Sequence, residues 1–75
     1  MPTTQEIVND PKGLGQVIRK RRKEMKMTQQ EMANFCKLSH TGIGKIEMGI
    51  TDVKLSTLLK LCKFLGMEII VKIQV

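Results

Sequence analysis

The sequence predicts an all-α bundle of four to five short helices that ends in one short β-strand. Apolar residues recur at helical spacing over most of the chain, beginning with Leu14, Val17, Ile18 and Met25. The last nine residues alternate between two faces instead. A chain of 75 residues has room for one small domain only. We therefore expect a tail over residues 1–9, a helical domain over residues 10–66 and a strand over residues 67–75.

The expected helices are bounded by capping signals. Asp10 is placed as the N-cap of the first helix, with Pro11 at its first position. Thr28 and Glu31 form a capping box that opens the second helix. Ser39 is the natural N-cap of the third helix. The four helices are expected to cover about residues 11–26, 29–37, 40–48 and 55–65, with Gly49 and Gly66 stopping the last two.

Composition excludes several classes of protein. The 13 Lys and Arg residues outnumber the 7 Asp and Glu residues and give a net charge of +6. Two cysteines, Cys36 and Cys62, are too few for a disulfide scaffold, and on apolar helix faces they are best explained as buried thiols. Phe35 and Phe64 are the only aromatic residues, which excludes a base-stacking sheet. No apolar run suits a membrane span or a signal peptide, so we expect a basic, cytoplasmic protein without membrane contact.

The C-terminal strand indicates a homodimer. A lone strand leaves backbone donors and acceptors unpaired, and the chain offers no second convincing strand. Pairing with the same strand of a second copy solves this about a two-fold axis. The apolar side chains of residues 55–65 also cover roughly 220° of the helix, more than one small core needs. The residues expected at the dimer interface are Leu61, Phe64, Ile69, Val71 and Ile73.

The second and third helices suggest nucleic-acid binding. Two short helices joined by a three-residue turn, residues 37–39, form a helix-turn-helix pattern. On the third helix Ile43 and Ile46 point inward, and the opposite face carries hydrogen-bonding groups that could reach base edges. Gly44 lies on that outer face, where it is either a tolerated surface residue or a point of close backbone approach to DNA. The outer face contains Thr41, Gly44, Lys45 and Met48, with His40 at its edge.

Four motifs, in order and spacing, resemble the Cro/phage-repressor helix-turn-helix family. They are Ile18-Arg19-Lys20-Arg21-Arg22, Met27-Thr28-Gln29-Gln30-Glu31-Met32-Ala33, Ile43-Gly44-Lys45-Ile46-Glu47-Met48-Gly49 and Leu58-Leu59-Lys60-Leu61-Cys62-Lys63-Phe64-Leu65-Gly66. The match covers about residues 14–66. The C-terminal strand is similar to that of HipB-type antitoxins, the repressor-like partners of HipA-type kinase toxins.

The resemblance implies roles for individual residues. Arg22 and Glu47 match an ion pair between the first and third helices, where the helical wheel alone allows Arg21 or Arg22. The chain departs from the family at Lys37, where a glycine usually occupies a left-handed turn. The residues expected to read bases are His40, Thr41, Gly44 and Lys45, and those expected at phosphates are Gln29, Ser39, Arg19 and Lys20.

Each of these roles has a plainer alternative. A basic run on a helix, such as Arg19 and Lys20, is usually a solvated face. His40 and Thr41 could be ordinary exposed residues at a helix start. Lys45 could contact guanine or only a phosphate.

No catalytic, cofactor or metal-binding pattern emerges. One histidine and two isolated cysteines do not have zinc-site spacing, and the glutamates have structural explanations. We hypothesise a homodimeric repressor, not an enzyme, that binds a palindromic operator in double-stranded DNA. The HipB resemblance implies an antitoxin that binds a HipA-like kinase toxin and autorepresses their shared operon. The alternative is an adaptor that uses the helix-turn-helix scaffold to bind protein only.

Overall fold

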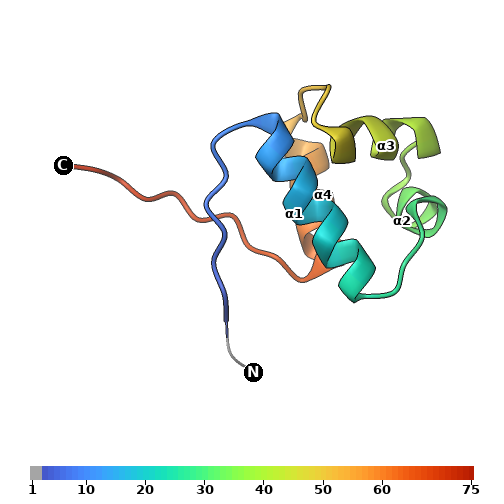
Figure 1. The fold of residues 1–75 in the computed structure, drawn as a ribbon, viewed down its shortest axis with the longest axis horizontal. Helices are drawn as coiled ribbons and strands as arrows, with labels where there is room; N and C mark the ends of the chain where they lie inside the picture. The colour runs from blue at the N-terminus through green and yellow to red at the C-terminus, as the bar shows by residue number, and fades with distance from the viewer. Residues whose placement is uncertain (1–2) are drawn as a thin grey trace.

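Four α-helices make up the ordered body of the computed structural model, which describes residues 3–75. Their bounds are α1 (Pro11–Glu24), α2 (Gln29–Cys36), α3 (His40–Met48) and α4 (Leu55–Leu65). Helix α1 packs against both α3 and α4, and α2 packs between α3 and α4 (Figure 1). The expectation of a bundle of short helices is confirmed. Of the predicted tail over residues 1–9, residues 1 and 2 lie outside the described part of the chain, and the remainder is exposed coil.

All three predicted side-chain caps are present. The Asp10 carboxylate accepts from the Gly13 N–H at 2.7 Å, and Ser39 Oγ accepts from the Gly42 N–H at 2.9 Å. In the capping box, the Glu31 N–H donates to Thr28 Oγ1 and the Thr28 N–H donates to Glu31 Oε1, both at 3.0 Å. These bonds satisfy backbone donors that have no partner within the helix, and so they set where each helix begins.

A left-handed residue follows each helix, and in two cases it is a lysine. Lys26 and Lys37 have φ of 58° and 57°, whereas Gly49 and Gly66 occupy the same conformation after α3 and α4. Helix α1 therefore ends at Glu24, before the expected limit near Lys26. Both lysine turns close with the six-residue hydrogen bond of a Schellman motif: Met27 N–H to Arg22 O at 3.1 Å and Leu38 N–H to Ala33 O at 2.8 Å. The turn forms without glycine.

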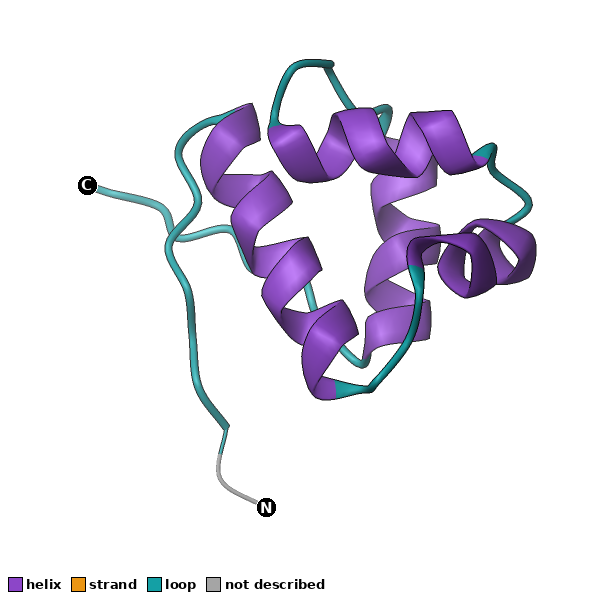
Figure 2. Ribbon diagram, turned by 45° about the vertical axis from the view of Figure 1, so that its right-hand side comes forward, coloured by secondary structure: helices purple, strands orange, loops and turns teal. Residues whose placement is uncertain are grey.

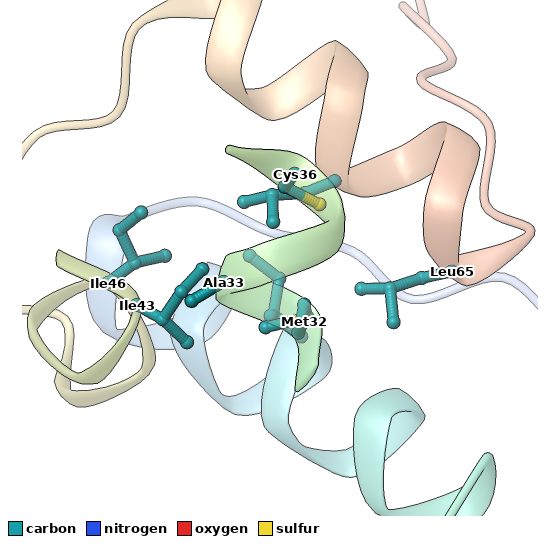
Figure 3. Packing of buried hydrophobic residues seen from close by; sticks show 8 residues of the cluster. Met32, Ala33, Cys36, Ile43, Ile46 and Leu65 are labelled. Atoms are coloured by element: carbon teal, nitrogen blue, oxygen red, sulfur yellow. The ribbon is translucent and has the colours of Figure 1, made fainter. Parts of the chain in front are cut away.

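The core lies where the four helices meet. Figure 3 shows Ile43 of α3 beside Ala33 of α2, with Met32 and Cys36 on the same helix as Ala33. The buried apolar cluster comprises Ile18, Met32, Ala33, Cys36, Ile43, Ile46, Leu61 and Leu65. Gly15 allows α1 to approach α3 closely, because a Cβ at this position would collide with the backbone at Ile46 and Glu47. This close contact fixes the position of α3 on the surface of the bundle.

One predicted interface residue is misplaced. Leu61 is 0% exposed and belongs to the core, so it is not available to a second copy, and the expectation for it is wrong. The apolar side chains of α4 that remain uncovered are instead Leu55 and Leu59, which are 64% and 52% exposed. Phe64 is half-buried and packs against Phe35, with ring centroids 4.4 Å apart and ring planes tilted by 43°.

Residues 67–75 form no strand in the described chain (Figure 2). Beyond Met67, which packs against the core, the segment runs away from the helices as an exposed coil (Figure 1). A single copy of residues 3–75 provides no neighbouring strand to satisfy its backbone groups. The strand predicted from the alternating pattern is therefore absent from the isolated chain.

Candidate nucleic-acid interface

Helix α3 presents one polar face outward. Ile43, Ile46 and Glu47 are buried on its inner side. The predicted reading face is accessible: His40, Thr41 and Lys45 are exposed, together with Met48, and Gly44 is half-buried. A Cβ at Gly44 would meet no heavy atom within 4 Å, so the backbone there borders open space. The face therefore combines polar side chains with a point where the backbone itself is accessible.

A buried ion pair joins α3 to α1. Arg22 Nε donates to Glu47 Oε2 at 2.7 Å and Arg22 Nη2 donates to Glu47 Oε1 at 3.0 Å, which makes the pair bidentate. A third donor, Nη1, reaches the Met27 carbonyl at 2.7 Å and so ties the α1–α2 turn to the pair. The hydrogen bond to Glu47 raises the pKa of Arg22, against an opposing effect of burial. The structure thus contains the pair that the resemblance implies.

Gln29 extends this pair to the start of α3. Its Nε2 donates to Glu47 Oε1 at 3.2 Å, and its Oε1 lies 3.0 Å from His40 Nε2. Arg22, Glu47, Gln29 and His40 therefore form one continuous chain of hydrogen bonds, which we call the polar relay. Gln29 was expected at a phosphate, and its two bonds to Glu47 and His40 were not predicted from the sequence. These bonds depend on how two helix starts come together in space, which no local pattern encodes.

The residues that were expected at phosphates have different surroundings in the structure. Arg19 borders a shallow hollow of about 570 Å³, whose other lining residues include Gln29 and Met48. Lys20 does not line this hollow and instead pairs with Glu6 at 3.5 Å in an exposed contact. The Ser39 hydroxyl accepts a hydrogen bond from the Gly42 N–H as the N-cap of α3. Of these residues, Arg19 and Gln29 lie beside the outer face of α3.

Other kinds of site find no support in the described residues. No group of His, Cys, Asp or Glu side chains in residues 3–75 has the geometry of a metal site. Cys36 and Cys62 are buried, and desolvation raises the pKa of both thiols, as expected for unreactive core residues. Within the same range, none of the helices combines the length and apolar character that a membrane span requires.

Comparison with known families decides the classification. The family model described as Helix-turn-helix (HTH_3) matches residues 18–71, which is most of the chain and includes α2, α3 and α4. The chain belongs to this helix-turn-helix family. The match confirms the resemblance drawn from the four sequence motifs. No curated protein matches the sequence.

Several solved structures share this helix-turn-helix fold. The restriction-modification controller protein C.AhdI from Aeromonas hydrophila is 29% identical, with a TM-score of 0.74 over 77% of this chain and 88% of that one. SinR, the master regulator for biofilm formation, solved in complex with DNA, is 25% identical, with a TM-score of 0.69 over 73% of this chain and 89% of that one. A single-residue variant of HipB, in its complex with the O2 20mer, is 21% identical and shares the fold, with a TM-score of 0.78 over 93% of this chain and 96% of that one.

Proposed function

We propose that this protein is a transcriptional repressor that binds a specific site in double-stranded DNA through the outer face of α3. The observation that carries the proposal is the exposed polar face of His40, Thr41 and Lys45 on a helix whose inner side is anchored by a buried ion pair. A rigid helix with exposed hydrogen-bonding side chains is what major-groove reading requires. The likeness to restriction-modification controllers and to SinR, which was solved with DNA, supports it.

In this proposal the residues divide by role. His40, Thr41 and Lys45 contact base edges, and Gly44 allows the α3 backbone to approach the duplex. Arg19 and Gln29 contact phosphates from the neighbouring hollow. The net charge of +6 per chain attracts the phosphate backbone, so affinity falls as salt rises and counterion release weakens.

The proposed active form is a homodimer. Residues 69–75 carry Ile69, Val71 and Ile73 on one face of an extended segment, all exposed in the single chain. Pairing this segment with its copy satisfies both backbones and covers these side chains, and Phe64 of α4 is the further residue that we assign to the interface. Two recognition helices related by a two-fold axis then meet half-sites of a palindrome spaced about 34–36 Å apart.

A paired substitution tests the reading face. Thr41→Ala with Lys45→Ala should abolish binding to a preferred site selected from random DNA, because both side chains are exposed on the outer face of α3 and carry hydrogen-bonding groups. The matched control is Ser56→Ala with Lys60→Ala, which removes the same charge and a similar hydroxyl from exposed positions on α4. The control should keep site preference. An unchanged footprint for the first pair contradicts the assignment.

More specifically, we propose that this repressor is an antitoxin. The fold likeness to HipB extends over 93% of the chain, whereas the likeness to C.AhdI covers 77%. The corresponding partner is a HipA-like kinase toxin, and the operon shared with it is the autorepressed target. Co-expression with the product of the neighbouring gene tests this idea: a stable complex that protects the operon's own promoter supports it. A complex without any selected DNA site favours the protein-binding adaptor instead.

A further inference from the structure

The polar relay determines which atom of Gln29 faces which neighbour. The Glu47 carboxylate, already paired with Arg22, can only accept hydrogen bonds. The Gln29 group at 3.2 Å from Glu47 Oε1 must therefore be the amide NH₂, and the group facing His40 must be the carbonyl oxygen. An exchanged amide would place two acceptors together at Glu47. The orientation of this glutamine thus follows from chemistry alone.

The same reasoning settles the roles of the two His40 nitrogens. Gln29 Oε1 is an acceptor, so His40 Nε2, at 3.0 Å, must carry the proton and donate. A neutral imidazole has one donor and one acceptor, which leaves Nδ1 as the acceptor. The Arg22–Glu47 ion pair thus sets the orientation of the Gln29 amide, and the Gln29 amide sets which nitrogen of the exposed His40 ring carries the proton.

We propose that His40 is a specificity-determining residue that accepts a hydrogen bond from the exocyclic amino group of a base in the major groove. The proposal rests on the proposed function, in which α3 enters that groove. A bare acceptor is repelled by phosphate oxygens and by guanine O6 and N7, which are acceptors themselves. It is matched by adenine N6 or cytosine N4, the two donors that the major groove displays. Gln29 is then a positioning residue that acts on bases through His40.

The free protein provides the first test. At pH 8, ¹⁵N spectra of the full chain should show the His40 ring protonated on Nε2 only. Gln29→Met removes the acceptor and should return the ring to a mixture of both tautomers. The matched control is Gln30→Met, because Gln30 lies next to it on α2 but bonds to Asn34. A wild-type ring protonated on Nδ1, or a Gln29→Met spectrum unchanged from wild type, overturns the proposal.

DNA carrying altered bases provides the second test. Random-pool selection with the wild type and with His40→Ala identifies the position whose preference depends on His40. Replacing the base there with an analogue that lacks the amino group, purine for adenine or pyrimidin-2-one for cytosine, should weaken wild-type binding about fivefold, the value of one hydrogen bond. His40→Ala should be insensitive to the replacement, and Gln29→Met should lose most of the sensitivity. Gln30→Met should behave as wild type.

The outcomes separate this proposal from the function on which it rests. Sensitivity to a 7-deazapurine instead, which removes a ring acceptor, shows that His40 donates and overturns the proposal. So does a selected site that is identical for wild type and His40→Ala while the Thr41 and Lys45 pair remains essential. Failure of every variant and the wild type to select any DNA contradicts the proposed function itself, while the spectroscopic test of His40 still stands on its own.

Discussion

At the scale of single residues, two glycines within helices have opposite surroundings. Gly15→Ala should destabilise the fold by about 1–3 kcal/mol, because its methyl group meets the α3 backbone at Ile46 and Glu47. Gly44→Ala meets nothing and should gain up to about 1 kcal/mol from helix propensity. Urea denaturation measures both. If the α3 backbone lies close to DNA, Gly44→Ala must also lose affinity severalfold despite its greater stability, and unchanged affinity would show that Gly44 is a plain surface position.

The two left-handed lysines hold a strained backbone that a substitution can relieve. Lys37→Gly should raise the free energy of unfolding by about 0.5–1 kcal/mol, because glycine adopts φ of 57° without the clash of a Cβ, although it also makes the unfolded chain more flexible. The control is Lys23→Gly in the last turn of α1, where helical geometry makes glycine unfavourable by up to about 1 kcal/mol. Opposite signs for the two variants in thermal melts support this account. A destabilised Lys37→Gly protein speaks against it.

At the scale of elements, the α1–α3 ion pair is the contact most sensitive to change. Glu47→Gln should destabilise the protein by about 3 kcal/mol, because it leaves the Arg22 guanidinium buried without a counter-charge. For so small a domain this approaches the whole stability. Replacing both partners, Arg22→Met with Glu47→Leu, should recover most of it. Chemical denaturation of the wild type, the Glu47→Gln protein and the double variant measures these differences. A Glu47→Gln protein as stable as the wild type would contradict a buried Arg22–Glu47 ion pair.

The capping box of α2 makes stability depend on pH in the acid range. Bonds from the Thr28 backbone and hydroxyl lower the pKa of Glu31 below its ordinary value of 4.5. A depressed carboxyl pKa gives stability that is present above the unfolded value and is lost as pH falls through the folded value. The difference in melting temperature between wild type and Glu31→Gln should therefore be constant near neutrality and shrink below about pH 4.5. A difference independent of pH would assign the capping to Thr28 alone.

The elements also show what could be predicted from sequence and why the rest could not. The caps at Asp10, Thr28 and Ser39 depend on residues three apart, and all were predictable. The Arg22–Glu47 pair followed from family spacing. Leu61 was misassigned because the prediction assumed that the apolar face of α4 packs on one surface of the core. In the structure α4 packs on both α1 and α2. The link from Gln29 to His40 is a tertiary contact between two helix starts, and it carries no periodic signal.

At the scale of the whole molecule, the proposed homodimer depends on the C-terminal segment. A chain that ends at Met67 keeps every helix and the core contact of Met67, and it removes only exposed residues. It should show the same helical circular dichroism as the full chain but sediment as a monomer at micromolar concentration, where the full chain is expected to be a dimer. A truncated chain that remains a tight dimer would place the interface elsewhere, with Leu55 and Leu59 the leading alternative.

Dimeric DNA recognition by α3 is the claim on which the residue roles depend. The most direct measurement is selection of duplexes from a random pool by the purified 75-residue chain, followed by sequencing. We predict one enriched site with two-fold symmetry, its half-sites about one helical turn apart, and binding that weakens steeply with salt. A pool that stays random through successive rounds at low salt would contradict the account.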